Sequence, residues 1–244
     1  MLIKLATLVL GPCLLLQGKY VRKTTPLLPE AAGEREGVSG DGVRLRLLII
    51  GDSAAAGVGV KHQDEALAGK LVGLLQKTYT LQWKLIARTG ATTLSTFKML
   101  SKLESKSYDV VVLSLGVNDV TGMSGSETWL AQQQRLLDKI KSLYTPRLII
   151  VNGIPPMQLF PALPQPLRWY LGKKAALMSN LLQSHLTKAQ DIVFLPLDFA
   201  NDPGLMASDG FHPGPEAYSV WARSLAQLIQ SRKVVTDVLA DINE

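Results

Sequence analysis

Short apolar runs alternate with amphipathic stretches along most of the chain. From Val43 onward, five runs are continuous and rich in Val, Ile and Leu, which is typical of strands buried on both faces. We predict these strands at Arg46–Gly51, Trp83–Ala87, Val110–Leu115, Leu148–Asn152 and Ile192–Leu195.

The segments between these runs have helical periodicity. Within Glu65–Tyr79, for example, Leu67, Leu71 and Leu74 fall on one stripe, as on the core-facing side of a helix. The predicted helices are Glu65–Tyr79, Leu94–Leu103, Glu127–Leu143, Gly172–Lys188 and Pro215–Ser231.

Strands that alternate with helices predict a parallel sheet with helices on both faces. We therefore expect an α/β fold, a three-layer α/β/α sandwich around a mostly parallel sheet of five strands. Ligands in such sheets bind beyond the carboxyl ends of the strands. Ser53 follows the first predicted strand, Gly90 the second and Asn118 the third. Asp209 and His212 follow the last. All five residues are expected at the same edge of the sheet.

The N-terminal segment has a different character. The apolar stretch Leu5–Leu16 is followed by the basic residues Lys19, Arg22 and Lys23. It is short for a membrane-spanning helix, which needs about 20 apolar residues. Its apolar core suits a secretory signal, but no small-residue cleavage site follows. Two interpretations stay open: a hydrophobic helix packed on the body or on a membrane surface, and an export or anchor signal.

These observations divide the chain into two parts. Residues 1–42 are interpreted as an N-terminal apolar segment and tether, and residues 43–244 as a single domain. The N-terminal segment makes peripheral membrane contact one expected partnership. It also leaves the location open between cytoplasmic, membrane-associated and exported.

Composition excludes several classes of protein. Hydrophobic residues make up 47% of the 244 residues and charged residues 19%, so the chain can form a core and is not globally disordered. The net charge is +6, but the basic residues are scattered, and we expect no nucleic-acid partner. One cysteine, Cys13, and three dispersed histidines give neither a disulfide nor a metal-ligand pattern. No metal and no cofactor are expected.

Candidate chemistry begins at Ser53, where the chain leaves a buried strand and enters the small residues Ala54–Gly57. We expect a tight strand-to-helix turn there, whose backbone N–H groups favour developing negative charge near the hydroxyl. The plainer interpretation is that Ser53 only caps the helix. Asp52 is interpreted as a cap or a hydrogen-bonding brace rather than a catalytic acid.

A second group of polar residues lies near the C-terminus. Asp209 precedes His212 by three residues, close enough to accept a hydrogen bond from one ring nitrogen while the other faces outward. That arrangement fixes the tautomer and raises the basicity needed to deprotonate a serine. Gly90 and Asn118 add a backbone and a side-chain N–H donor for an oxyanion, although both also suit ordinary turns.

In the order and spacing of these motifs, the chain resembles the SGNH hydrolases, also called the GDSL esterase/lipase family. The four motif blocks are Ile50-Gly51-Asp52-Ser53, the Gly90 segment, Gly116-x-Asn118-Asp119 and Asp209-x-x-His212. Ala54 stands where the family name has leucine, which puts only the substrate preference in doubt.

The resemblance implies a flavodoxin-like fold and a division of roles at the site. Ser53 would be the nucleophile, His212 the base and Asp209 the orienting acid, with an oxyanion hole from the Ser53 N–H, Gly90 and Asn118. It also implies a serine esterase for small carboxylic esters with short- to medium-chain acyl groups. Carbohydrate O-deacetylation, lysophospholipid hydrolysis and thioester cleavage stay open on the same fold, as does a non-catalytic lipid-binding module.

The segment Gly153–Gly172 is the most irregular part of the body and follows the fourth predicted strand. Its prolines keep it out of the sheet, and Phe160, Leu163 and Trp169 supply apolar surface. We interpret these three side chains as an acyl-binding wall, or else as groups that only pack over a helix.

Overall fold

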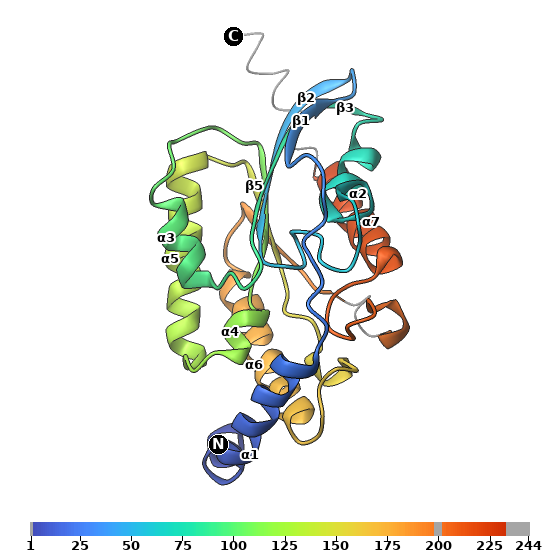
Figure 1. The fold of residues 1–244 in the computed structure, drawn as a ribbon. Coiled ribbons are helices and arrows are strands. Elements are labelled where there is room, and N and C mark those ends of the chain that lie inside the picture. Colours follow the sequence, from blue (N-terminus) through green and yellow to red (C-terminus); the bar gives the residue numbers. More distant parts are fainter. Residues whose placement is uncertain (1, 198–201, 233–244) are drawn as a thin grey trace.

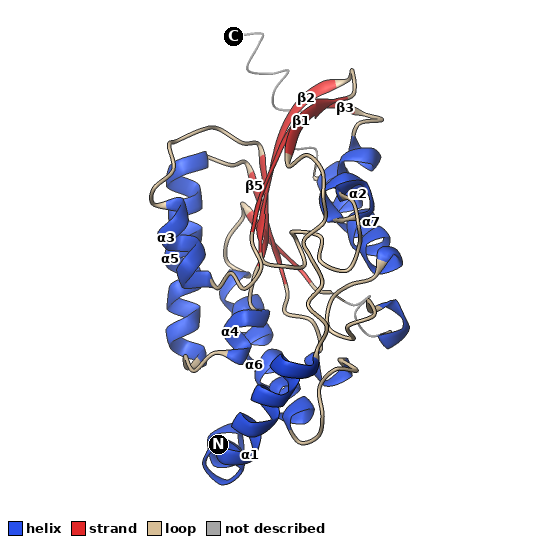
Figure 2. Ribbon diagram, in the orientation of Figure 1, coloured by secondary structure: helices blue, strands red, loops and turns tan. Residues whose placement is uncertain are grey.

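A central six-stranded sheet organises the molecule, which the computed structural model describes in residues 2–197 and 202–232. Figure 1 and Figure 2 show helices on both faces of this sheet, so the expected three-layer α/β/α architecture is confirmed. The strands are β1 (Glu36–Ser39), β2 (Val43–Gly51), β3 (Tyr79–Ala87), β4 (Val110–Ser114), β5 (Leu148–Asn152) and β6 (Ile192–Leu195).

The strands run side by side in the order β1-β3-β2-β4-β5-β6, and every neighbouring pair except β1 and β3 is parallel. The expectation of five strands is wrong by one, because β1 lies within the predicted tether. Its only large apolar side chain, Val38, is exposed, and the strand is held by antiparallel backbone pairing with β3. A strand that buries no apolar face leaves no hydrophobic pattern to detect.

Two helix groups cover the sheet. On one face lie α2 (Leu67–Leu75) and α7 (Pro215–Ser231), and on the other lie α3 (Thr93–Leu100), α5 (Ser126–Tyr144) and α6 (Leu167–Leu186). The short α4 (Val117–Thr121) and the N-terminal α1 (Leu2–Thr24) lie toward the lower end in Figure 1. Short 3-10 helices occupy Gln63–Glu65, Met157–Leu159 and Pro203–Leu205.

One predicted helix is too long. The helix expected over Glu65–Tyr79 ends at Leu75, and Tyr79 already belongs to β3. β3 pairs with β1 on one edge and with β2 on the other. Its first residues alternate between buried and more exposed, as in a strand, and do not continue the stripe of the helix.

The core has two parts, one on each face of the sheet. Leu48 and Ile50 of β2 point into the cluster under α3, α5 and α6, whereas Leu47 and Ile49 point into the cluster under α2 and α7. All four are fully buried. This alternation explains why the strand reads as a continuous apolar run.

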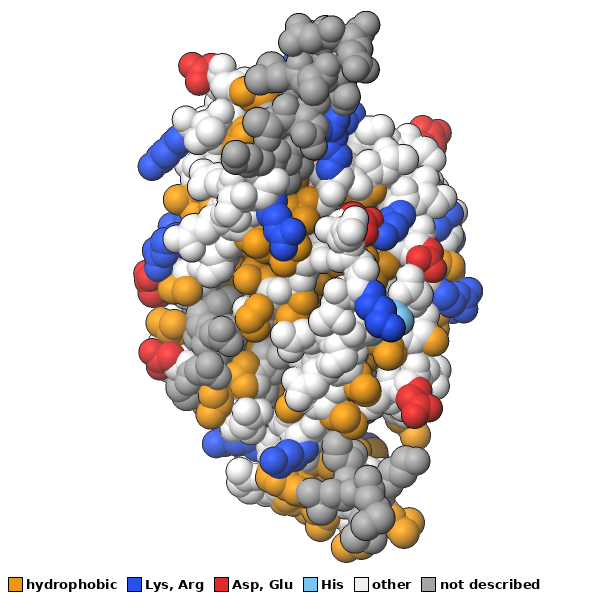
Figure 3. Space-filling view, turned by 180° about the vertical axis from the view of Figure 1, so that it is seen from behind, with side chains coloured by type: hydrophobic (Ala, Val, Ile, Leu, Met, Phe, Trp, Pro, Cys, Tyr) orange, Lys and Arg blue, Asp and Glu red, His pale blue; other side chains and the backbone are white. Residues whose placement is uncertain are grey.

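The N-terminal segment forms a helix that packs on the body. α1 buries Leu14 and Val21 in the core cluster that includes α6, and Gln17 exchanges hydrogen bonds with the backbone of Gln165 and Leu167. Across residues 2–197 and 202–232, no helix has both the length and the apolarity to cross a bilayer. Figure 3 shows Lys and Arg side chains spread over one face of the molecule rather than gathered in a stripe.

Asp109, at the start of β4, fastens the central strands together. Its carboxylate accepts hydrogen bonds from the Arg46 backbone N at 2.7 Å, from Nη2 at 2.8 Å and from Nε at 3.1 Å. Burial raises the pKa of Asp109, but the hydrogen bonds from Arg46 outweigh it and hold the pKa below its usual value.

We expect Asp109→Asn to lower the free energy of unfolding by about 1–3 kcal/mol at neutral pH, since it weakens a bonded carboxylate. A carboxyl with a depressed folded-state pKa stabilises the fold above its unfolded pKa and loses that contribution as the pH falls. Urea unfolding should therefore show the difference from wild type shrinking below about pH 4. The exposed Asp41→Asn is the control, and an equal loss in that variant would contradict the assignment.

Candidate active site

The predicted site residues lie where the strand order changes direction. β2 has β3 on one side and β4 on the other. The connection from β2 to β3 and the connection from β3 to β4 therefore run in opposite directions along the sheet, which leaves a crevice at the carboxyl ends of the strands. Ser53 follows β2, Gly90 follows β3, and Asn118 lies in α4 directly after β4. The loop before α7 brings Asp209 and His212 to the same edge.

The structure brings three of these side chains into one line of hydrogen bonds. His212 Nε2 lies 2.9 Å from Ser53 Oγ, and His212 Nδ1 lies 2.6 Å from Asp209 Oδ2. The other carboxylate oxygen, Asp209 Oδ1, accepts from the backbone N of Phe211 at 2.9 Å and of His212 at 3.0 Å. The carboxylate therefore fixes both the loop and the imidazole ring.

Asp209 is set up to remain ionised. Burial alone would raise its pKa. The hydrogen bonds from the His212 ring and from two backbone N–H groups lower the pKa by more than burial raises it, so the pKa lies below its usual value. An ionised carboxylate accepts the Nδ1–H of the imidazole and leaves the Nε2 lone pair directed at Ser53.

The segment after Ser53 is a series of turns, so the expected strand-to-helix turn at this serine is wrong. Asp52 Oδ1 accepts from the Ala54 N at 3.1 Å, which makes Asp52 the brace of the turn. The Tyr218 hydroxyl of α7 holds the segment from the other side, at 2.9 Å from the Ala54 O and 2.7 Å from the Val58 O. Sequence reasoning missed Tyr218, which lies on the buried stripe of its helix like any core aromatic.

Small residues are required at this turn for a steric reason. A Cβ built on Gly51 would lie 2.4 Å from the Ala55 Cβ and 2.8 Å from the Ser114 O. Real Cβ atoms do not approach that closely, so the strand end and the turn can meet only with glycine at this position.

The two other donor residues lie close together, Gly90 on the loop after β3 and Asn118 in α4. Asn118 Nδ2 donates to the Ala91 O at 3.0 Å, which joins α4 to the loop that carries Gly90. An amide NH₂ has two hydrogens, so one remains for another acceptor. Gly90 has a φ of +77°, which favours glycine, and a Cβ there would meet nothing within 4 Å.

A buried network that sequence reasoning missed fastens these loops together. Asp119 accepts from the Thr93 N at 3.1 Å and from Thr93 Oγ1 at 3.0 Å. Thr93 Oγ1 in turn accepts from Trp129 Nε1 at 3.1 Å and Gln133 Nε2 at 2.9 Å of α5. The network connects the start of α3, which follows the Gly90 loop, with the residue after Asn118 in α4, so the two segments hold their positions together.

A cleft with an empty volume of about 670 Å³, open to solvent, lies beside Ser53 and His212. Phe160 lines it, and the Phe160 ring contacts the Phe211 ring with a centroid distance of 5.1 Å. Leu163 is buried in the core, and Trp169 is partly exposed on α6; neither lines the cleft. Sequence reasoning missed further lining residues, of which the apolar ones include Leu115, Leu197, Leu205, Met206 and Trp221.

Asp52 also lines the cleft, and the pKa of its carboxyl group is far from the usual value. Burial raises the pKa of its carboxyl to about 7, against which the hydrogen bond from Ala54 and the nearby His212 act only in part. Among the residues that the structure describes, no group of three or more His, Cys, Asp or Glu side chains is arranged to hold a metal ion.

Comparison with known proteins shows which family the chain matches and which solved structures share its fold. The model of the GDSL-like lipase/acylhydrolase family matches residues 49–220. A search of curated proteins gave no match.

Solved structures share the fold at low sequence identity. A lipase from a goat rumen metagenome, Lip_vut3, is 17% identical, with a TM-score of 0.58 over 74% of this chain and 95% of the other. The acetylxylan esterase Axe2 of Geobacillus stearothermophilus is 18% identical, with a TM-score of 0.55 over 76% and 94%. The psychrotrophic esterase EstA of a Pseudoalteromonas species is 17% identical, with a TM-score of 0.55 over 76% and 97%.

The buried Asp52 predicts an unusual dependence of stability on pH. With a folded-state pKa of about 7 and an ordinary value of 3.8, the native state keeps the proton over a range in which the unfolded state loses it. The free energy of unfolding therefore falls as the pH rises through this range. Asp52→Asn does not titrate, so its stability relative to wild type should rise by about 2–3 kcal/mol between about pH 5 and about pH 8.

Urea unfolding of both proteins at the two pH values measures this change. A constant difference between wild type and Asp52→Asn would show that the carboxyl ionises normally.

Proposed function

The chain belongs to the GDSL-like lipase/acylhydrolase family and is a hydrolase of carboxylic esters; from this premise we propose that it is a serine esterase acting through an acyl-enzyme on Ser53. The preferred substrates are small esters with short- to medium-chain acyl groups. The observation that carries the proposal is the line of hydrogen bonds from Asp209 through His212 to Ser53.

In the proposed reaction, His212 Nε2 takes the proton of Ser53 Oγ as that oxygen attacks the ester carbonyl carbon. The imidazolium that forms is stabilised by Asp209, whose low pKa keeps it ionised. His212 then gives the proton to the departing alcohol. Water attacks the acyl-enzyme with His212 again as base, and the carboxylic acid leaves as Ser53 recovers its proton.

The negative oxygen of each tetrahedral intermediate needs donors that are already oriented. We assign them to the backbone N–H groups of Ser53 and Gly90 and to the amide of Asn118. The Thr93–Asp119 network and the hydrogen bond from Asn118 to Ala91 support this assignment, because they hold α4 and the Gly90 loop in fixed positions relative to one another. Oriented donors cost no reorganisation during the reaction and typically contribute 10²–10³ in turnover, about the loss seen when one is removed.

The apolar side of the cleft supports an acyl group rather than a sugar as the bound part of the substrate. Phe160 is the member of the proposed acyl wall that touches the cleft, whereas Leu163 packs in the core next to it and Trp169 stands on α6. Deacetylation of carbohydrates, hydrolysis of lysophospholipids and thioester cleavage use the same machinery and differ only in what the cleft accepts. A non-catalytic lipid-binding module would not need the aligned serine and histidine.

The proposal includes a peripheral membrane contact through the N-terminal segment. Its support is the helix α1, which packs on the body with part of its apolar surface left exposed.

Replacing the nucleophile tests the reaction. Ser53→Ala should lower the rate of p-nitrophenyl butyrate hydrolysis by at least about 10⁴-fold, because no acyl-enzyme can form. Ser219→Ala, which removes an exposed hydroxyl on α7, is the matched control and should keep the wild-type rate. Activity retained in Ser53→Ala would refute the proposed nucleophile.

Assays of the wild type on p-nitrophenyl butyrate, acetylated xylan and an acyl-CoA, with Ser53→Ala as the inactive reference, separate the substrate classes. The proposal predicts that the simple ester gives the highest kcat/KM. A higher value on acetylated xylan or on the thioester would assign the enzyme to that class instead.

Phe160→Ala tests the acyl wall. Removing the ring enlarges the apolar side of the cleft, so kcat/KM for p-nitrophenyl octanoate relative to butyrate should rise by about tenfold. The ratio does not depend on how much of the variant is folded. Trp169→Ala is the control, since that side chain does not line the cleft. An unchanged ratio in Phe160→Ala would remove Phe160 from the wall.

A further inference from the structure

One side of α1 presents a set of apolar side chains to solvent. With about 3.6 residues per turn, positions 8, 9, 15, 16 and 20 fall within less than half of the helix circumference. The opposite side is the one that packs on the body through Leu14 and Val21. The exposed side chains, which we call the α1 surface, are each 63–80% exposed and are Leu8, Val9, Leu15, Leu16 and Tyr20.

Basic residues extend the α1 surface toward the C-terminal end of the helix. Lys19 and Lys23 fall on the same side as the apolar residues, Arg22 lies at its edge, and all three are exposed. Long basic side chains can lie along an apolar boundary while their charges reach the headgroups. Apolar residues followed by clustered cations complement an anionic lipid surface, with the apolar side chains at the acyl boundary and the cations at the phosphates.

The α1 surface lies near the entrance to the site. In Figure 1, α1 lies at the end of the molecule to which the parallel strands direct their carboxyl ends. Gln17 bonds to Gln165 and Leu167, at the end of the loop that carries Phe160 into the cleft. That loop also touches the catalytic loop, since the Ala162 N donates to the Gly210 O at 3.1 Å.

A second apolar point lies at the same end. Met123 is fully exposed in the loop between α4 and α5, which also lies toward the lower end in Figure 1. The buried Lys174 of α6 donates to the Gly122 O at 2.7 Å, so this loop is attached to the helix on which α1 packs. Two separate elements therefore present apolar side chains around one end of the molecule.

We propose that the α1 surface docks the protein on an anionic lipid bilayer, with α1 lying in the interface and the carboxyl edge of the sheet facing the lipid. Ester substrates then reach Ser53 from the bilayer. The docking stands on α1 alone, whereas the lipid-borne substrate rests on the proposed esterase function.

Vesicle binding of the full-length protein tests the docking. Co-sedimentation with phosphatidylcholine vesicles is compared with and without phosphatidylglycerol. The wild type should bind the vesicles that contain phosphatidylglycerol, and added salt should weaken binding. Leu8→Ser/Leu15→Ser/Leu16→Ser should reduce the partition coefficient by at least about tenfold, because three apolar side chains no longer enter the interface.

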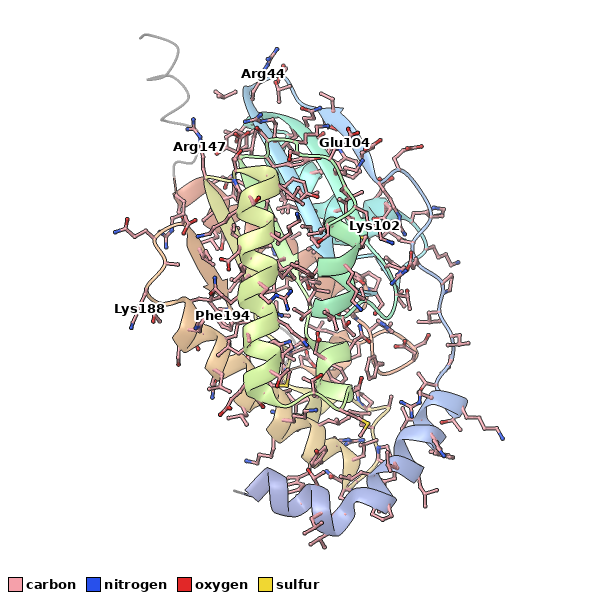
Figure 4. The ribbon with its side chains drawn as sticks, turned by 90° about the vertical axis from the view of Figure 1, so that its left-hand side faces the viewer. Arg44, Lys102, Glu104, Arg147, Lys188 and Phe194 are labelled. Atoms are coloured by element: carbon pink, nitrogen blue, oxygen red, sulfur yellow. The ribbon has the colours of Figure 1, made fainter. Side chains whose placement is uncertain are left out.

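Two further variants separate the contributions. Lys19→Glu/Lys23→Glu keeps good helix-forming residues and should lower binding by about fivefold or more for each position. Arg44→Glu/Lys102→Glu makes the same change of charge at exposed positions away from α1, as Figure 4 shows, and should retain more binding. Val38→Ser/Val43→Ser/Leu103→Ser is the matched control for exposed apolar side chains outside α1.

Activity measured in the same samples keeps the two proposals apart. All variants should hydrolyse soluble p-nitrophenyl butyrate at the wild-type rate without lipid, whereas hydrolysis of a medium-chain ester held in vesicles should fall in the α1 variants. If the wild type hydrolyses neither substrate, the proposed esterase function is refuted and the proposed docking is not.

Three results would overturn the docking. The first is a wild type that does not bind phosphatidylglycerol vesicles. The second is binding that the control variants lose as strongly as the α1 variants. The third is a concentration-dependent dimer without vesicle binding that disappears in the triple α1 variant, which would assign the α1 surface to a second copy of the chain.

Discussion

The hydrogen bond of 2.9 Å between His212 Nε2 and Ser53 Oγ joins residues that are 159 positions apart in the sequence, and the rest of the fold serves that contact. Ser53 follows the end of β2, and the Tyr218 hydroxyl of α7 donates to the Ala54 O and the Val58 O in the turns after it. His212 is held by Asp209, just before the same helix begins. The loop that carries His212 leads directly into α7, and α7 also fastens the turns after Ser53, so one helix is linked to both groups.

Three buried carboxyl groups around the site differ in what surrounds them, and this sets their ionisation. Asp209 receives a ring N–H and two backbone N–H groups, and its pKa is lowered. Asp119 also receives hydrogen bonds, from Thr93, yet burial dominates and raises its pKa. Asp52 accepts from the Ala54 N, but burial dominates and raises its pKa to about 7. The proposed catalytic acid is the one whose hydrogen bonds outweigh its burial, as expected of a carboxylate that must stay charged beside the imidazole.

Much of the fold and the positions of the proposed catalytic residues could be predicted from the sequence, because the central strands are buried on both faces and site residues follow their ends. Leu47 to Ile50 read as a strand for that reason, and Ser53, Gly90 and Asn118 followed from the parallel order. β1 could not be predicted, since it pairs through its backbone and buries no side chain of its own. Nor could the Thr93–Asp119 network or the contact of Tyr218, because polar atoms that meet across the core leave no periodic pattern.

The central claim is that Ser53 is made nucleophilic by His212. Its most direct test is the reaction of the purified protein with a fluorophosphonate, followed by mass spectrometry of the peptides. The account predicts one adduct, on the peptide that contains Ser53 and at Ser53 itself, with labelling lost in Ser53→Ala and strongly slowed in His212→Ala. An adduct at another serine, or labelling of Ser53→Ala as fast as of wild type, would contradict it.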